Sequence, residues 1–251
     1  MDRRTDATEL LDGRLDDPRT LAGNLRDLGR INRWLGGVTM SEDAIDALAA
    51  HRPDLSLLDV GTGGADIPVA LLERAAARGR RWSVVALDSR PEVLAAAVLA
   101  RPELATMDGI ELHVGDGRSL PYPDRSFDVT HCSLVVHHCT PDETVALFRE
   151  MARVARSGVV VNDLDRSRLG WIGAWLLGHV LTRNRYTRND APLSVRRAYR
   201  VDEMTAMLRV AGLTPVRTIR GSFGQRYAIA ALPTPDDTDP ESPPDPQGAG
   251  E

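Results

Sequence analysis

The sequence predicts an α/β fold: a doubly wound, mostly parallel seven-stranded sheet with N-terminal helices and a helical lid insertion. Short, continuously apolar runs alternate with longer amphipathic segments from residue 55 onward. Parallel strands that are buried on both faces have such runs, and each crossover between them packs a helix back onto the sheet. A glycine-rich turn follows the first run directly, at the place where many such sheets bind a ligand.

Residues 1–52 are expected to form an N-terminal helical cap. Apolar residues recur at spacings of three and four from Leu21 to Leu35, which gives one apolar stripe along a helix. The glycines after Leu35 end this helix, and Ser41 with the two acids behind it predicts the N-cap of a second one.

Residues 53–167 are expected to form the cofactor-binding α/β core. The apolar runs predict strands, each with its exit turn, over 55–61, 82–88, 110–116, 126–136 and 158–164. The segments between them predict helices over 67–79, 91–102 and 142–156.

Residues 168–200 interrupt this alternation, and we expect them to form a lid insertion over the ligand edge of the sheet. The insertion reads as an apolar helix over 169–181 followed by an arginine-rich loop. Residues 201–232 then complete the core with one helix and two last strands. Residues 233–251 are dense in proline and acid and have little to bury, which predicts a disordered tail.

Composition limits the classes of function. A formal net charge of -5 gives no overall attraction to phosphates, so a nucleic-acid partner is not expected. The two cysteines and the charged first residues favour a cytoplasmic protein over an exported one. The apolar run 169–181 is too short to cross a bilayer, so no stable membrane insertion is expected. The oligomeric state is left open.

Polar residues at the strand ends predict the ligand site, because ligands bind outside the carboxyl ends of the strands in open α/β sheets. Gly61 and Gly63 let the backbone approach a ligand closely. The carboxylates of Asp59 and Asp66 beside this turn would repel a pyrophosphate, yet they suit a ligand with an ammonium and a sulfonium group. These charges favour S-adenosyl-L-methionine (SAM) over a nicotinamide dinucleotide.

Two later strands also end in acids. Asp88 can accept hydrogen bonds from both hydroxyls of a ribose, and Asp116 can accept one from an adenine amino group. The candidate cofactor-binding residues are Asp59, Gly61, Thr62, Gly63, Asp88, Ser89, Asp116, Gly117 and Ser133.

The order of these motifs resembles the class I SAM-dependent methyltransferases, in the small-molecule branch that includes the ubiquinone and menaquinone methyltransferases. The segments that carry the resemblance are "LLDVGTGGAD", "VVALD", "GDGRSLPYPDRSFDVT", "SLVVHH" and "LFREMARVARSGVVVNDL". The resemblance implies a Rossmann-like sheet in which Gly61 and Gly63 back the methionine part of SAM, Asp88 holds the ribose and Asp116 holds the adenine. The later "NDAPLSVRRAYRVDEM" is also similar to methyltransferases found beside type III polyketide synthases. One departure is "ARSG" before the fifth strand, where the family has "LKPGG".

Two adjacent histidines follow the fourth strand, beside the expected position of the transferable methyl group. A phenol, with a pKa near 10, is a poor nucleophile until a base such as an imidazole takes its proton, so His137 is the candidate general base. Asp163 could orient His137 or cap the next helix. His138 is a second catalytic candidate, with capping of the following helix as its alternative.

A zinc site built from Cys132, His137, His138 and Cys139 is disfavoured. Cys132 should lie inside the strand, and the cluster has no pair of cysteines separated by two residues. No metal is therefore expected.

Trp171, Trp175 and Asn162 are the candidate substrate-binding residues, with core packing as the alternative for the tryptophans. The sequence thus predicts methyl transfer from SAM to a small, largely apolar acceptor in secondary metabolism, with an oxygen of a phenolic polyketide or quinone-like metabolite as the methylated atom. Two alternatives stay open: a SAM-binding protein of this fold without methyl transfer, such as a cyclase or regulatory subunit, and a NAD(P)-dependent oxidoreductase.

Overall fold

A seven-stranded sheet with the order β3-β2-β1-β4-β5-β7-β6 forms the centre of the computed structural model, which describes residues 1–3, 7–15, 17–49, 52–180 and 182–234. The strands are β1 Asp54–Val60, β2 Arg81–Asp88, β3 Ile110–Val114, β4 Phe127–Ser133, β5 Ala155–Leu164, β6 Leu213–Arg220 and β7 Arg226–Pro233. Only β7 runs antiparallel to its neighbours β5 and β6. The predicted doubly wound, mostly parallel sheet is confirmed.

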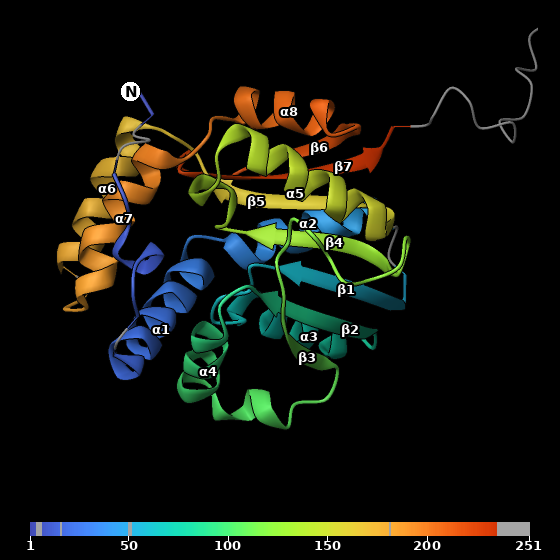
Figure 1. The fold of residues 1–251 in the computed structure, drawn as a ribbon, viewed down its shortest axis with the longest axis horizontal. Helices are drawn as coiled ribbons and strands as arrows, with labels where there is room; N and C mark the ends of the chain where they lie inside the picture. The colour runs from blue at the N-terminus through green and yellow to red at the C-terminus, as the bar shows by residue number, and fades with distance from the viewer. Residues whose placement is uncertain (4–6, 16, 50–51, 181, 235–251) are drawn as a thin grey trace, which may run out of the picture.

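Helices cover both faces of this sheet (Figure 1). They are α1 Pro18–Trp34, α2 Gly37–Ala49, α3 Asp66–Ala77, α4 Pro91–Ala100, α5 Pro141–Val154, α6 Arg168–Val180, α7 Arg185–Arg197 and α8 Val201–Val210. Short 3-10 turns are η1 Leu10–Asp12, η2 Pro102–Ala105 and η3 Val136–His138.

The core consists of two apolar clusters on opposite faces of the sheet. Successive strand residues alternate between them, so that Leu57 packs with the side chains of α1 to α4 while Leu58 packs with those of α5 and α8. Both side chains are fully buried. This alternation is the period of a strand, and it fixes which strand-end residues face which side of the sheet.

Helices α1, α6 and α7 lie beyond the carboxyl ends of the parallel strands, on the left of Figure 1. Helix α7 contacts α1 and α6. The arginine-rich loop predicted after α6 is therefore wrong, because residues 185–197 form a helix that buries Tyr186 and Val195 on its inner face. Asn184 caps this helix by accepting a hydrogen bond from the Tyr186 amide at 3.0 Å.

The N-cap predicted at Ser41 is also wrong. Helix α2 begins at Gly37, and the Ser41 hydroxyl lies inside it, buried and hydrogen-bonded to His131 at 2.8 Å. Among the helices that the structure describes, none combines the length and hydropathy needed to cross a bilayer. The predicted disordered tail lies, from residue 235 on, outside the described residues.

Candidate functional site

A cavity of about 470 Å³ lies at the carboxyl ends of the first strands. Eight of the nine cofactor-binding candidates line it: Gly61, Thr62, Gly63, Asp88, Ser89, Asp116, Gly117 and Ser133. They come from the loops after β1, β2 and β3 and from the end of β4, which the sheet brings to one edge. We refer to this space as the cofactor cavity.

The glycine turn after β1 is pinned to β2 and open toward the cofactor cavity. The amides of Gly61 and Thr62 donate to the Leu87 carbonyl at 2.8 and 2.9 Å. Gly61 has a φ of +70°, and a Cβ atom there would clash with Val135. At Gly63 a Cβ atom would meet nothing within 4 Å, so this stretch of backbone faces open space. The buried hydroxyl of Thr62 has no hydrogen-bond partner among the described residues.

Asp88 is held in a fixed orientation at the end of β2. Its two carboxylate oxygens accept hydrogen bonds from the amides of Gly63 and Arg90, each at 3.0 Å. Burial raises the pKa of Asp88 above its ordinary value, and the side chain lines the cofactor cavity. Each oxygen has a second lone pair with which to accept a hydroxyl from a ligand.

Asp116 also lines the cofactor cavity, but its carboxylate is already paired. Arg118 Nη2 donates to Asp116 Oδ2 at 2.9 Å, and this hydrogen-bonded arginine lowers the pKa of Asp116. The side chain is about half exposed. An adenine amino group would therefore share this acceptor with Arg118.

Asp59 does not line the cavity. It is 2% exposed, and its Oδ1 lies 2.5 Å from Nδ1 of the buried His131. Because Leu58 and Val60 belong to the cluster under α5, the side chain between them points to the opposite face of the sheet. Asp59 thus links β1 to β4 through His131 and points away from the cofactor cavity. Its predicted contact with the cofactor is corrected accordingly.

A second cavity of about 450 Å³ lies between α1, α6 and α7, and we call it the apolar cavity. Its hydrophobic walls include Ile31, Leu35, Leu169, Ile172, Leu176 and Leu177. Among its polar lining residues, Glu9, His137 and His138 form one cluster, which we call the polar cluster. The two cavities share the lining residues Leu11, Leu28, Asn32, Leu134 and His138, so they adjoin one another there.

His137 faces the apolar cavity with one ring nitrogen and is held by Asp163 through the other. The Nδ1–H of His137 donates to Asp163 Oδ1 at 2.7 Å, and in the neutral ring this tautomer places the free lone pair on Nε2. Burial alone would raise the pKa of Asp163, but the nearby charge and hydrogen bond of His137 lower it. Asp163 Oδ2 also accepts hydrogen bonds from the amides of Val136 and His137 at 2.9 and 3.3 Å, so Asp163 orients His137 and holds the N-terminus of η3, not that of α6.

His138 does not cap α5 either. Thr140 is the N-cap of α5 and accepts a hydrogen bond from the Glu143 amide. His138 Nδ1 instead lies 2.7 Å from Asp12 Oδ1, and its ring borders both cavities.

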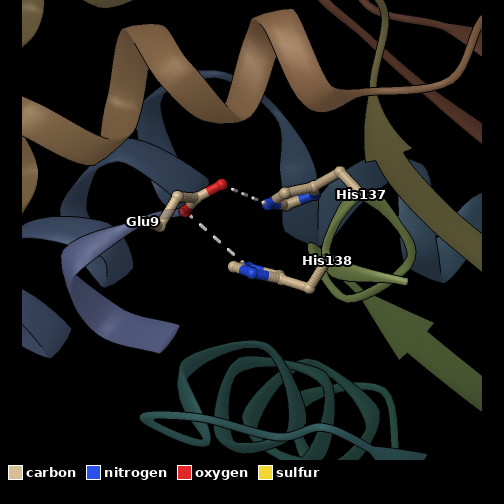
Figure 2. Close-up of side chains that lie close together, drawn as sticks. All are labelled: Glu9, His137 and His138. Atoms are coloured by element: carbon tan, nitrogen blue, oxygen red, sulfur yellow. Dashed lines mark ion pairs between the residues drawn. The ribbon is translucent and has the colours of Figure 1, made fainter. Parts of the chain in front are cut away.

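Glu9 is a site residue that the sequence did not reveal. Figure 2 shows its carboxylate facing both imidazoles, with Oε1 4.0 Å from His137 Nε2 and Oε2 3.9 Å from His138 Nε2. Burial raises the pKa of Glu9 to about 7. The sequence around Glu9 has no periodic pattern of apolar residues. In the structure, Asp190 of α7 anchors this segment by accepting a hydrogen bond from the Leu10 amide at 2.8 Å. A contact between residues 180 positions apart leaves no local signal in a sequence.

The donor atoms of Glu9, His137 and His138 lie within 4.8 Å of one another, a spacing that could also suit a metal ion. Two neighbours compete with a cation there. Ser194 donates to Glu9 Oε2 at 2.9 Å, and Arg197 Nη1 lies 3.6 Å from Oε1. These contacts suit a ligand hydroxyl better than a divalent ion.

The two cysteines do not join this cluster as thiolates. Cys132 is fully buried within β4, and burial raises its pKa. Burial likewise raises the pKa of Cys139 to about 11, which leaves its thiol protonated at neutral pH. Metal ligation by cysteine needs the thiolate.

Arg226 is a second residue that the sequence did not reveal. It is 2% exposed, and its three nitrogens donate to Asn162 Oδ1, Asn32 Oδ1 and Ser133 Oγ at 2.5 to 2.6 Å. Burial lowers its pKa to about 10, so it stays charged at neutral pH. Arg226 borders the apolar cavity, whereas Asn162 lies behind it and touches neither cavity, which corrects the predicted substrate contact of Asn162.

The two tryptophans of α6 do not line the apolar cavity. Ile172 and Leu176, each one position further along the helix, line it instead. One position is a rotation of about 100° around a helix, which is enough to turn a side chain away from a pocket. The ring of Trp175 stacks on His179 with centroids 4.5 Å apart.

The residues of the cofactor cavity fit SAM. Its carboxylates are Asp12, Asp66, Asp88, Asp116 and Glu143, and its arginines are Arg90 and Arg118. This excess of negative charge suits a ligand with ammonium and sulfonium groups. The unpartnered hydroxyl of Thr62 and the open backbone at Gly63 offer contacts to a polar ligand.

Comparison with known proteins agrees with this fit. The methyltransferase domain family matches residues 58–161. The ubiquinone/menaquinone biosynthesis C-methyltransferase UbiE of Dinoroseobacter shibae is 31% identical over 206 residues, covering 76% of this chain and 77% of that protein. A demethylmenaquinone methyltransferase of Staphylococcus epidermidis is 33% identical over 111 residues, covering 44% of this chain and 43% of that protein.

Solved structures show the same fold. A SAM-dependent methyltransferase from Aquifex aeolicus matches with a TM-score of 0.60 at 18% identity, covering 88% of this chain and 100% of that one. An O-methyltransferase family 2 protein from Planctomyces limnophilus, in complex with apigenin, matches with a TM-score of 0.63 at 19% identity, covering 92% of this chain and 63% of that one. The chain therefore belongs to the class I SAM-dependent methyltransferases of the ubiquinone/menaquinone type, and SAM is its cofactor.

Proposed function

We propose that this enzyme transfers the methyl group of SAM to an acceptor held in the apolar cavity. The observation that carries the proposal is that the two cavities adjoin at the five lining residues that they share. A methyl group moves by in-line displacement, so donor and acceptor must meet across a short gap from which water is excluded. The junction of the two cavities is the place where the two ligands come closest.

His137 is the proposed proton acceptor. SAM supplies an electrophilic methyl group when it is bound, and the chain must supply alignment and a deprotonated acceptor. With Nδ1–H held by Asp163, Nε2 of a neutral His137 can take the proton of a hydroxyl placed beside Glu9 and His138 in the apolar cavity. Glu9 and His138 face the same point and can hydrogen-bond that hydroxyl.

The proposed acceptor is a small, largely apolar molecule with one hydroxyl group, such as a phenolic polyketide or a quinol. The side chains of α6 that line the cavity are apolar, whereas Glu9, His137 and His138 form a polar cluster in its wall. A ligand with an apolar body and a single polar head matches this distribution.

We propose oxygen as the methylated atom, with the neighbouring ring carbon as the second candidate. Removing the hydroxyl proton creates charge on the oxygen and on the adjacent ring carbons, so the same base activates both. The relative from Dinoroseobacter shibae is named a C-methyltransferase, which favours carbon. The structural neighbour named as an O-methyltransferase contains apigenin, a phenol, which favours oxygen.

The proposal is tested by incubating the protein with methyl-labelled SAM and two probe acceptors, 1,4-naphthohydroquinone and 5-pentylresorcinol. We expect a product one methylene heavier, and its NMR spectrum will tell an oxygen-bound methyl from a carbon-bound one. Binding of SAM and of both probes without any labelled product would support the alternative of a SAM-binding protein without methyl transfer. The cytoplasmic location stays a prediction from the sequence.

A further inference from the structure

We propose that the outer face of α6, together with Trp34 and Phe223, docks on the surface of an anionic lipid bilayer. This is a peripheral contact, which is consistent with the absence of a membrane-spanning helix among those described. The docking does not depend on the methyl-transfer proposal. If both hold, an apolar acceptor can pass from the bilayer directly into the apolar cavity.

The first observation is an apolar stripe that faces outward. Leu169, Ile172, Leu176 and Val180 follow at helical spacings of three and four, and they are 74%, 47%, 48% and 73% exposed. The apolar stripe of a helix in a globular protein normally faces the core. Trp34 at the end of α1 and Phe223 before β7 are exposed as well.

The second observation is that this stripe forms the rim of the apolar cavity. Leu169, Ile172, Leu176 and Phe223 each line the cavity and are exposed at the same time. The same apolar side chains therefore lie on the outside of the molecule and in the wall of the proposed acceptor site. Large exposed apolar patches on a folded protein mark binding surfaces.

The third observation is the charge around the stripe. Residues 168–200 contain seven arginines and one acid, although the whole chain has a net charge of -5. The single acid, Asp190, is buried and holds the Leu10 and Leu11 amides. The exposed arginines of this region and of α1 are Arg19, Arg26, Arg30, Arg33, Arg168, Arg183, Arg185, Arg188 and Arg200.

An apolar stripe with arginines around it matches a bilayer with anionic headgroups. The apolar side chains enter the boundary between headgroups and acyl chains, and the arginines pair with the lipid phosphates. A second copy of this chain is a poorer partner. A two-fold interface would place the same arginine-rich face against itself, and like charges would repel.

Vesicle sedimentation tests the proposal. The full chain is mixed with vesicles of phosphatidylcholine alone and of phosphatidylcholine containing phosphatidylglycerol. We expect it to sediment with the second kind, and to be released by salt because the arginine contacts are screened. The doubly substituted V180S/R188E variant changes two exposed residues that line neither cavity, and we expect its vesicle binding to fall at least tenfold.

The matched control is the V216S/R217E variant, which makes the same changes on the exposed strand β6 and should bind vesicles like the unchanged protein. Both variants should methylate 1,4-naphthohydroquinone in solution at the unchanged rate, which separates docking from catalysis. The proposal is overturned if the protein stays in solution with both kinds of vesicle. Equal vesicle binding by the two variants would overturn it too. So would a protein that binds no vesicles but forms dimers, if V180S/R188E prevents dimer formation and V216S/R217E does not.

Discussion

The imidazole of His137 is the group on which the proposed chemistry depends most. Replacing His137 by alanine removes the proton acceptor while leaving the cofactor cavity untouched, since His137 does not line it. We expect kcat to fall by about 10² to 10⁴ with the Kd for SAM unchanged. Asp163→Asn should also lower kcat, because the amide no longer fixes the Nδ1–H form of the ring. Turnover by His137→Ala at the original rate would remove this residue from the mechanism.

Asp88 should affect the binding of SAM. Its buried carboxylate is oriented by two backbone amides and lines the cofactor cavity. Asp88→Ala should raise the Kd for SAM by roughly 10- to 100-fold, the cost of losing hydrogen bonds to a charged group, with little change in kcat at saturating SAM. Asp116→Ala is the comparison and should cost less, because that carboxylate is half exposed and paired with Arg118. If calorimetric titration gives the larger Kd for SAM to Asp116→Ala, Asp116 contributes more to SAM binding than Asp88 does.

Glu9 links the site to the pH dependence of stability. Its pKa is raised from 4.5 to about 7, chiefly by burial. Between these values the folded chain keeps a proton that the unfolded chain has released, so the free energy of unfolding falls as pH rises. The effect is on the order of 3 kcal/mol across this window.

Glu9→Gln stays neutral and should lose this part of the slope. Its stability relative to the unchanged protein should therefore improve from pH 4.5 to 7, measured by urea unfolding at several pH values. If the free energies of unfolding of the two proteins change with pH in parallel, Glu9 is ionised in the folded state across this pH range.

Residues at strand ends were predictable one by one, whereas residues brought in from afar were not. Asp88 and Asp116 follow apolar runs in the sequence, and the rule that parallel strands end at one edge brings them together. Glu9 and Arg226 reach the site through contacts with segments far away in the chain. Asp59 satisfied the same strand-end rule and still failed, because the alternation of faces along β1 directs it below the sheet.

At the scale of elements, the glycine turn after β1 is a connection that tolerates little change. Gly61 and Gly79 have nearly the same φ, +70° and +71°, but only at Gly61 does an added Cβ atom meet a neighbour, Val135. Gly79→Ala should cost about 1 to 2 kcal/mol of stability, the cost of the left-handed backbone. Gly61→Ala should cost about 1 to 3 kcal/mol more through overpacking, and it should weaken SAM binding. Equal losses in urea unfolding would show that Val135 moves aside freely.

The lid shows where sequence patterns fail at this scale. Six of the seven arginines in residues 168–200 lie within the segment 183–200, and this high arginine content is typical of an exposed loop. The segment nevertheless forms α7, because Tyr186, Val195 and small polar side chains give it a buried face against α1 and α6. Helix α6 was predictable as a helix, but the direction of its tryptophans depends on how it docks, and docking is a tertiary property.

At the scale of the whole molecule, the order of strands and helices was predictable because each crossover must return a helix to the sheet. The sequence predicted that ligands bind at the carboxyl ends of the strands, but it did not predict two cavities there. Their separation into a charged and an apolar space depends on α1, α6, α7 and the segment around Glu9, which meet only in the folded chain. The division into a cap, a core, a lid, a C-terminal part of the core and a tail stays a prediction.

The central claim is that donor and acceptor meet where the two cavities adjoin. The most direct measurement is an isotope-filtered NOE experiment on the His137→Ala variant, in which turnover is slow, with methyl-¹³C SAM and 1,4-naphthohydroquinone both bound. We predict a cross-peak between the SAM methyl group and the ring protons of the acceptor. Saturation of both ligands with no such cross-peak, and with contacts from the acceptor only to side chains away from Leu134 and His138, would contradict the claim.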